Sequence, residues 1–238
     1  MGNSGLIKAV FFDWFNTLAF YDPPREVLHS QVLHKFGIDV APSKLFPGLM
    51  AADRYFFTEV SRSPLTKRSP EEQAKAYVHY AEVMLDTAGC KVSKELLPQI
   101  IREWPQIFNG MKFVLFDDVL TNLKNLKERH FILGLITNAK KDAVAVYGKL
   151  GLDPYLDFIV TSEEAKTDKP DPAIFQLALE KAGVTPSEAI HVGDQYHVDI
   201  VGARGAGVTP ILIDRFDLYP EIKDCIRIRA LSELFGYL

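Results

Sequence analysis

Residues 7–18 of the chain read IKAVFFDWFNTL. The first part, Ile7 to Phe12, is a largely apolar run of strand length, rich in Val and Phe, and it ends abruptly at Asp13. A short apolar run bounded in this way is typical of a strand that is buried on both faces of a sheet. The segment therefore predicts a buried strand with a carboxylate at its carboxyl end.

Three further runs have the same form. Each is short, apolar and followed at once by small or polar residues: Phe131–Ile136 before Thr137 and Asn138, Ala189–Val192 before Gly193 and Asp194, and Pro210–Ile213 before Asp214. Helical patterns lie between them, over Val119–Glu128 and Pro172–Ala182. Strands that alternate with helices are typical of a doubly wound α/β domain. We therefore predict an α/β fold with a parallel sheet.

The stretch from about Ala19 to Lys112 has a different pattern, that of successive amphipathic helices without a buried strand. One helix should begin at Ser69, because a capping hydroxyl, Pro at the first helical position and Glu72 form a helix-start signal, and it should run to about Ala88 before Gly89. Two more are predicted over Leu45–Ser61 and Ser93–Phe108. We predict a helical insertion, residues 19–112, after the first strand of a core formed by residues 1–18 and 113–238.

The composition is that of an ordinary globular protein. The chain has 238 residues, 47% of them hydrophobic and 24% charged, with a formal net charge of −4. This length allows one large domain or a core with a smaller partner domain. The acidic balance argues against nucleic acid as the main partner, so we expect a small-molecule partner. The expected oligomeric state is a monomer or a homodimer.

Cys90 and Cys225 lie far apart and form no metal-ligand pattern, so we expect two reduced thiols and a cytoplasmic location. The N-terminal residues lack a basic region followed by an apolar run, the pattern of a secretory signal. No apolar stretch approaches the roughly 18 residues of a membrane span, so no membrane partner is expected.

Polar residues follow four of the predicted strands. In open α/β sheets, ligands bind outside the carboxyl ends of the strands, near the point where the strand order reverses. One Asp or Thr after a strand is explained well enough as a cap of the next helix. Four such strand ends in one chain instead predict a single site.

These residues resemble the haloacid dehalogenase superfamily, whose signature is a set of short motifs at strand ends. The motifs read here as FFDWFNTL at 11–18, ITN at 136–138, KPDP at 169–172, and GD at 193–194 followed by Asp199. The resemblance extends from residue 7 to about residue 214. It implies a Rossmann-like catalytic core and a hydrolase of the phosphatase-like branch, with a cap that closes over a small phosphorylated substrate.

The resemblance also implies roles for the acidic residues. Asp13 is the expected nucleophile, which attacks phosphorus and becomes an aspartyl phosphate. Mg²⁺ is the expected cofactor, because two carboxylates facing a phosphate repel it unless a hard cation intervenes. Its expected protein ligands are Asp13, the backbone carbonyl of Phe15, and Asp194.

Three polar residues are expected to contact the phosphoryl group: Thr137, Asn138 and Lys169. The Thr137 hydroxyl can donate to one phosphoryl oxygen, and the Lys169 ammonium can neutralise another oxygen and Asp13. We predict Thr137 and Lys169 as catalytic residues beside Asp13. Asp199 is expected behind them, where it orients waters or Lys169.

Phe15 departs from the superfamily pattern. Phosphatases that this chain resembles usually carry a second Asp two residues after the nucleophile, which serves as general acid and base. A phenyl ring cannot transfer a proton, so this help is missing or comes from elsewhere. Asn16 stands where Gly is usual, and Asn tolerates a left-handed backbone better than most residues. The loop geometry is therefore expected to persist.

Several activities stay open at this point. One is a phosphatase for substrates with a good leaving group, or one that borrows a base from His197 or the cap. Others are a 2-haloacid dehalogenase, whose members carry an aromatic residue at position 15, a phosphonate hydrolase, and a catalytically weakened phosphate-binding protein. The acidic loop with Asp194 and Asp199 favours the metal-dependent phosphatase over the dehalogenase, which needs no metal.

Other candidates carry weaker signals. His197 is interpreted mainly as an exposed loop residue and His191 as a structural one. Four cationic residues of the insertion are candidates for contacting an anionic tail of the substrate, but for each of them we favour the interpretation as part of a solvated helix face: Arg25, Arg54, Lys67 and Arg68.

Overall fold

The computed structural model describes residues 6–109, 111–139 and 144–238. By internal contacts the chain forms two compact units, one made of Met1–Phe20 and Val114–Leu238 and the other of Tyr21–Phe113. The two segments that join the units, β2 (Ala19–Asp22) and β3 (Lys112–Leu115), pair as a two-stranded sheet. The larger unit carries the predicted motifs.

The larger unit contains a six-stranded sheet in the order β5-β4-β1-β6-β7-β8. Every described pairing between neighbouring strands is parallel. The strands are β1 (Ala9–Phe12), β4 (Ile132–Thr137), β5 (Phe158–Thr161), β6 (Ala189–Gly193), β7 (Thr209–Ile213) and β8 (Ile226–Ile228). The predicted parallel, Rossmann-like sheet is therefore confirmed, and β1 lies inside it between β4 and β6.

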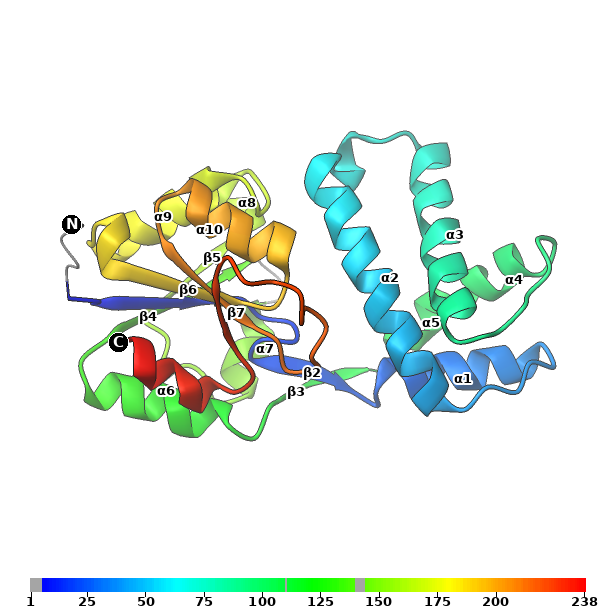
Figure 1. The fold of residues 1–238 in the computed structure, drawn as a ribbon, viewed down its shortest axis with the longest axis horizontal. Coiled ribbons are helices and arrows are strands. Elements are labelled where there is room, and N and C mark those ends of the chain that lie inside the picture. The colour runs from blue at the N-terminus through cyan, green and yellow to red at the C-terminus, as the bar shows by residue number, and fades with distance from the viewer. Residues whose placement is uncertain (1–5, 110, 140–143) are drawn as a thin grey trace. The chain divides into compact units, whose positions relative to one another are not determined.

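Helices cover both faces of this sheet, with α8, α9 and α10 on one face and α6 on the other (Figure 1). The α-helices are α6 (Val119–Glu128), α7 (Val144–Lys149), α8 (Ser162–Ala165), α9 (Pro172–Ala182) and α10 (Val201–Gly205). A π-helical turn spans Tyr196–Ile200, and 3-10 helices span Pro186–Glu188 and Leu231–Tyr237. The bounds of α6 and α9 match the two helices predicted from the sequence.

The core of the larger unit forms where α9 packs on the sheet. Phe11, Ile136 and Phe175 are fully buried there in one cluster. Burying a side chain of this size stabilises the fold by about 1.5–3 kcal/mol. This packing holds the carboxyl ends of β1 and β4 in place.

The smaller unit is helical, as predicted. It contains α1 (Arg25–Lys35), α2 (Pro42–Arg62), a 3-10 helix (Leu65–Lys67), α3 (Pro70–Thr87), α4 (Leu97–Arg102) and α5 (Trp104–Asn109). The predicted start signal of α3 forms, since the Glu72 N–H donates to the Ser69 hydroxyl and the Glu72 carboxylate accepts from the Ser69 N–H. Helices α2 and α3 approach closely at Gly48, where a Cβ atom would lie 2.2 Å from the Met84 carbonyl oxygen.

The prediction of one helix over residues 93–108 is wrong. The segment folds as the short helices α4 and α5, with Pro98 and Pro105 each in a first turn. Proline lacks an N–H and its ring clashes with the preceding turn, which disfavours both residues inside a longer helix, although α2 does accommodate Pro47. The sequence analysis also missed β2, β3 and the three-residue β8.

Within the part of the chain that the structure describes, no helix combines the length and apolar character needed to cross a membrane. Cys90 and Cys225 are both free thiols, as expected.

Candidate active site

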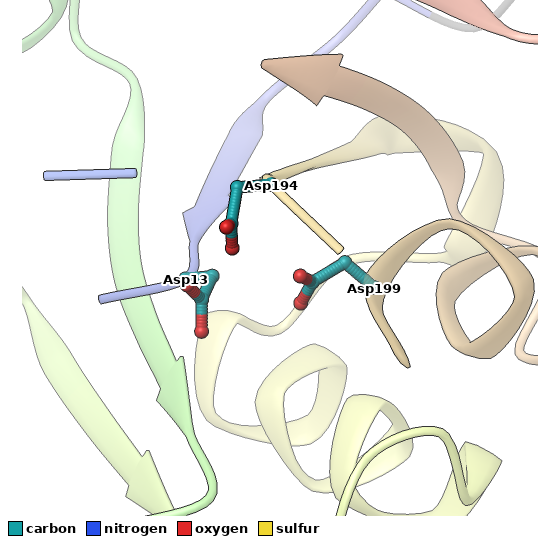
Figure 2. A group of neighbouring side chains, drawn as sticks. All are labelled: Asp13, Asp194 and Asp199. Atoms are coloured by element: carbon teal, nitrogen blue, oxygen red, sulfur yellow. The ribbon is translucent and has the colours of Figure 1, made fainter. Parts of the chain in front are cut away.

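Three carboxylates from the predicted motifs come together at the carboxyl end of the sheet. Oxygen atoms of Asp13, Asp194 and Asp199 lie within 4.8 Å of one another (Figure 2). Asp13 follows β1 directly, and its N–H donates to the Val192 carbonyl at 2.9 Å. Asp194 follows β6, and Asp199 lies in the π-helical turn beyond it. Parallel pairing of β1 with β6 therefore brings these acidic residues to one edge.

Lys169 connects two of these carboxylates. Its Nζ atom lies 2.5 Å from Asp13 Oδ1 and 2.7 Å from Asp199 Oδ1. The residue is only 4% exposed. Burial by itself lowers the pKa of Lys169, but the two carboxylates raise it above its ordinary value. Lys169 is therefore a fixed cation in the site.

Asp199 is held from three sides. Besides the Lys169 ammonium, its carboxylate contacts His191 Nε2 at 3.0 Å and accepts from the Gln195 N–H at 3.0 Å. Burial raises the pKa of Asp199, but Lys169 and His191 together bring it below its ordinary value. A Cβ atom at residue 193 would lie 2.3 Å from the carboxyl carbon of Asp199, so Gly193 leaves room for this anion.

The negative charge of Asp194 is less well compensated than that of Asp199. The Gln195 amide donates to Asp194 Oδ2 at 2.8 Å, and Gln195 accepts in turn from the Tyr219 hydroxyl at 3.2 Å. Burial, followed by the charges of Asp13 and Asp199, raises the pKa of Asp194 well above its ordinary value. Burial also raises the pKa of Asp13, although Lys169 opposes this.

The site therefore carries more negative than positive charge. Its three carboxylates face one ammonium, which leaves two negative charges when all four groups are ionised. The available donors are carboxylate oxygens, the type of ligand that hard divalent cations prefer. The donor set and the excess of negative charge both suit Mg²⁺.

The loop after Asp13 folds back onto the Asp13 side chain. Asn16 has φ 58°, which confirms the predicted left-handed backbone, and its N–H donates to the Ala19 carbonyl at 2.7 Å. This turn directs the Thr17 hydroxyl to Asp13 Oδ2 at 3.2 Å. The sequence analysis gave Thr17 no role, although it belongs to the first motif.

Arg215 fixes this loop from a distant part of the sequence. Its guanidinium donates to the Thr17 carbonyl at 2.9 Å and forms an ion pair with Asp118 at 3.0 Å. The same group lies over the Phe116 ring, 4.1 Å from the centroid. The sequence around Arg215 does not predict this contact, because the partners of Arg215 lie about a hundred residues or more away in sequence.

Thr137 and Asn138 lie at the end of β4, the strand that pairs with β1. Thr137 Oγ1 accepts from the Ala139 N–H at 3.2 Å. The Asn138 side chain accepts from the Lys169 N–H at 2.7 Å and donates to the Lys169 carbonyl at 3.1 Å. Asn138 therefore holds the backbone of Lys169, and its predicted contact with substrate stays a prediction.

The other candidates differ in their surroundings. Phe15 is half-buried beside the site loop. His191 is fully buried, in line with a structural role. His197 is half-buried rather than exposed, and its ring packs edge-on against Tyr196.

The cationic residues of the smaller unit do not all lie on a solvated face. Arg25 forms an ion pair with Asp53 in the interior of that unit, where the Tyr80 hydroxyl also donates to Asp53 at 2.8 Å. Arg68 pairs with Glu59 at 2.7 Å. Their side chains are 13% and 10% exposed, so the interpretation as solvated residues is wrong for both.

Two relatives are phosphatases by name. The chain is 28% identical over 215 residues to a glyceraldehyde 3-phosphate phosphatase of Methanothermobacter thermautotrophicus, which covers 88% of this chain and 86% of that protein. It is 44% identical over 93 residues to the pyrophosphatase PpaX of Bacillus pumilus. That match spans 39% of this chain and less than half of the relative, 43%.

Solved structures share the fold over nearly the whole chain. The HAD-hydrolase YfnB of Bacillus subtilis, solved with magnesium bound, aligns with a TM-score of 0.67 at 20% identity and covers 98% of this chain and 99% of that one. Structures of the same fold include both phosphatases and 2-haloacid dehalogenases. The fold alone therefore does not choose between these activities.

A protein-family model decides the family. The model of haloacid dehalogenase-like hydrolases matches residues 54–213, which include three of the four motifs. The remaining motif, around Asp13, lies next to them in the sheet. The chain therefore belongs to the haloacid dehalogenase-like hydrolase family.

Proposed function

We propose that this hydrolase is a Mg²⁺-dependent phosphatase that acts on a small phosphorylated metabolite through an aspartyl phosphate on Asp13. The observation that carries the proposal is the ion-paired cluster in which Lys169 joins Asp13 to Asp199 beside Asp194. The phosphatases among its relatives, a glyceraldehyde 3-phosphate phosphatase and a pyrophosphatase, support the same chemistry.

Asp13 is arranged to act as a nucleophile. Lys169 holds one of its carboxylate oxygens and Thr17 the other, so the carboxylate has a fixed orientation. Fixing the attacking group before the substrate binds lowers the entropic part of the barrier. In this proposal one Asp13 oxygen attacks phosphorus, the bond to the leaving oxygen breaks, and water later cleaves the aspartyl phosphate.

The transferring phosphoryl group spreads negative charge over its oxygens, so catalysis depends on neutralising that charge. Lys169 supplies a permanent positive charge next to Asp13. Thr137, at the end of the neighbouring strand, supplies a hydroxyl donor for a second oxygen. Asn138 acts by holding the Lys169 backbone.

The cation belongs beside Asp194. Asp13, the Phe15 carbonyl and Asp194 are the proposed ligands, and Asp199 stays on Lys169. Bound there, Mg²⁺ supplies the charge that lets an anionic substrate approach the carboxylates. Mg²⁺ suits this site because the donors are oxygen atoms and because the cluster carries two uncompensated negative charges when its four groups are ionised.

Phe15 restricts the range of substrates. Without an acid at this position, cleavage is easiest when the leaving group needs no proton, as in acyl phosphates or aryl esters. A 2-haloacid dehalogenase is the second candidate, because an aromatic residue at position 15 resembles that branch. The acidic pair Asp194 and Asp199 argues against it, since halide displacement needs no metal.

The smaller unit is proposed to act as a cap that excludes water from the reaction, the role that such an insertion has in the family. The proposed partner is a small phosphorylated molecule, and the proposed assembly is a monomer or a homodimer.

A substrate screen tests this function. Phosphate esters, acetyl phosphate, phosphonoacetaldehyde and 2-haloacids are each assayed with Mg²⁺ and with a chelator. We expect Mg²⁺-dependent release of phosphate, which Asp13→Asn abolishes because an amide is not a nucleophile. Asp153→Asn, at an exposed position outside the cluster, is the matched control and should keep full activity. Halide release that persists with the chelator would favour the dehalogenase instead.

A further inference from the structure

His191 is a buried imidazole that uses only one of its two nitrogen atoms. It lies in β6 and is fully buried, with its ring edge-on to Phe175 at 5.0 Å between ring centroids. Its Nε2 atom contacts Asp199, whereas Nδ1 has no hydrogen-bond partner among the residues that the structure describes. A buried polar atom without a partner is costly, so packing alone would favour an apolar side chain here. What the imidazole contributes is therefore the contact of Nε2.

The surroundings of the ring decide which nitrogen carries the proton. The Asp199 Oδ1 atom that faces Nε2 also accepts from the Lys169 ammonium at 2.7 Å, so it is a charged carboxylate oxygen and can only accept. Nε2 of His191 lies 3.0 Å from it and must be the donor. Burial lowers the pKa of His191, so its ring is neutral and has a single proton. That proton lies on Nε2.

Asp199 Oδ1 is thus shared by two donors, the Lys169 ammonium and the His191 ring. The same ammonium lies 2.5 Å from Asp13 Oδ1, so Asp199 and Asp13 compete for it. A hydrogen bond donated to a carboxylate stabilises its charge. The bond from His191 therefore weakens the hold of Asp199 on Lys169, which leaves more of the ammonium charge for Asp13 and for a bound phosphoryl group.

We propose that His191 is a positioning residue that donates from Nε2 to Asp199 and so keeps Lys169 on Asp13, where its ammonium can contact the phosphoryl group. The imidazole acts through Asp199 because it is fully buried and a substrate cannot touch it. The contact is a hydrogen bond, and no proton is transferred through it. This inference rests on the proposed phosphatase function.

The first experiment tests the position of the proton in the unmodified protein. Long-range proton–nitrogen correlation spectra of protein with isotope-labelled histidine distinguish a protonated ring nitrogen from an unprotonated one. The His191 signals are identified by their absence from the spectrum of His191→Gln. We expect a proton on Nε2 and none on Nδ1 at neutral pH. A ring with its only proton on Nδ1 would overturn the proposal, because Nε2 then has nothing to donate.

Three substitutions test what that donor does. His191→Gln offers an amide N–H at about the reach of Nε2, His191→Met has similar length without a donor, and His191→Asn has an amide that is one carbon too short. We expect His191→Met and His191→Asn to lower kcat/KM for 4-nitrophenyl phosphate by about 10-fold, the low end for a hydrogen bond to a charged group. The affinity for inorganic phosphate with Mg²⁺, measured by calorimetry, should fall as well. His191→Gln should recover most of both losses.

A double-mutant cycle with Asp199→Asn tests the route of the effect. The amide at residue 199 carries no charge for His191 to share. In this background His191→Met should therefore have no further effect on phosphate affinity, because the two residues act as one unit. Equal effects of His191→Met in both backgrounds would show that His191 acts by another route, and the proposal fails.

Urea unfolding shows which variants are folded. Equal losses of activity in folded His191→Gln and His191→Met would show that the ring acts by packing against Phe175, and an unchanged kcat/KM in His191→Met would show that it has no role in the reaction. Either result overturns the proposal. If His191→Met does not fold, His191→Asn and the spectra of the wild type still decide.

These results are separable from a failure of the proposed function. The phosphatase assignment stands as long as Asp13→Asn abolishes turnover, whatever the variants of His191 do. If Asp13→Asn keeps substantial phosphate release, the proposed function itself fails and the inference fails with it.

Discussion

Phe15 gives the site its sharpest chemical restriction. It lies two residues after Asp13, where the resemblance to phosphatases leads us to expect a second Asp. The side chains that contact the Asp13 carboxylate are those of Lys169 and Thr17. Lys169 is held as a cation by two carboxylates, so it does not release its proton to a leaving group. Hydrolysis of an aspartyl phosphate, which needs an activated water, should therefore be the slow step.

The first prediction follows from this slow step. Mixing the enzyme with excess 4-nitrophenyl phosphate should give a burst of 4-nitrophenol followed by a slower steady state, because the intermediate accumulates. Phe15→Asp should speed the steady state, by up to roughly 10²- to 10⁴-fold if the new carboxylate is aimed at the water. Phe15→Ala controls for the loss of packing. If the wild type shows no burst and cleaves alkyl phosphates rapidly, another residue must serve as the base. His197→Ala is then the variant to test.

The second prediction concerns His29 in the smaller unit. It is buried with its ring edge-on to Trp104, and burial, followed by the charge of Arg25, lowers its pKa from 6.5 to about 3. Between these values the unfolded chain binds a proton at His29 that the folded chain does not bind. Stability should therefore be complete above about pH 6.5 and fall as the pH drops toward 3.

Urea unfolding at a series of pH values measures this effect. His29→Phe should flatten the fall in the midpoint between pH 7 and 4, relative to the wild type. The control is His130→Asn at an exposed position with φ 66°, which Asn tolerates. If the slope of His29→Phe equals that of the wild type, other groups govern the acid response.

At the scale of elements, boundaries were predictable wherever the chain carries its own start and stop residues. Helix α9 begins at Pro172 after Asp171, whose carboxylate accepts from the Ala173 N–H, and it ends before Gly183 in a left-handed conformation. The segment 93–108 shows the opposite case, since its apolar periodicity suggested one helix and its prolines divide it in two. Strand β8 has three residues, too few for alternation to be visible.

Connections between elements were less predictable than the elements. Arg215 ties the end of β7 to the loop after β1 and to Asp118 before α6. Such contacts depend on which strands are neighbours, and the strand order follows from packing across the whole unit rather than from any local pattern. The same holds for Thr17, whose role becomes visible only when its hydroxyl is placed on Asp13.

The third prediction tests this connection. Arg215→Met keeps the apolar stem but leaves Asp118 and the Thr17 carbonyl without their donor. Removing one partner of a buried pair costs about 3 to 5 kcal/mol, and we expect the low end because Asp118 is 22% exposed. Activity should fall as well, since the loop that carries Thr17 loses its anchor. Urea unfolding and kcat measure the two effects.

Arg204→Met is the matched control for Arg215→Met. Arg204 pairs with Asp224 at the same distance, 3.0 Å, but these side chains are 44% and 51% exposed. An exposed pair of this kind contributes about 0 to 1 kcal/mol. Equal losses of stability in the two variants would show that the contacts of Arg215 stabilise the fold no more than an exposed ion pair does.

At the scale of the whole molecule, the fold places the site where the chain changes direction across the sheet. From β1 the chain continues to β4 on one side and later returns to β6 on the other, and the carboxyl ends of strands at such a reversal are where ligands bind in open α/β sheets. This explains why the strand-end carboxylates were predictable from the sequence. The surplus of negative charge in the site was not predictable from the sequence. It depends on the burial of Asp194 and on the ion pairs of Lys169 with both Asp13 and Asp199.

The last prediction uses that surplus to separate stability from function. Without metal, Asp194 is a buried carboxylate close to two other acids, so its charge opposes folding. Asp194→Asn should then be more stable than the wild type in a chelator, by about 1 to 2 kcal/mol, within the cost of an uncompensated buried group. Saturating Mg²⁺ at a hundredfold excess over Kd should stabilise only the wild type, by about 2.7 kcal/mol. The order of the two melting temperatures should therefore reverse between chelator and Mg²⁺.

Thermal unfolding of both proteins under both conditions measures this reversal, at roughly 2–4 °C for each kcal/mol in a chain of this size. Hydrogen exchange locates it, since added protection should appear first at the carboxyl ends of β1 and β6, next to the proposed ligands. Asp153→Asn, exposed and outside the cluster, should respond to Mg²⁺ as the wild type does. Equal stabilisation of Asp194→Asn and the wild type would place the cation elsewhere. A stable variant without activity would instead show that the acidic cluster is kept for chemistry at the expense of the fold.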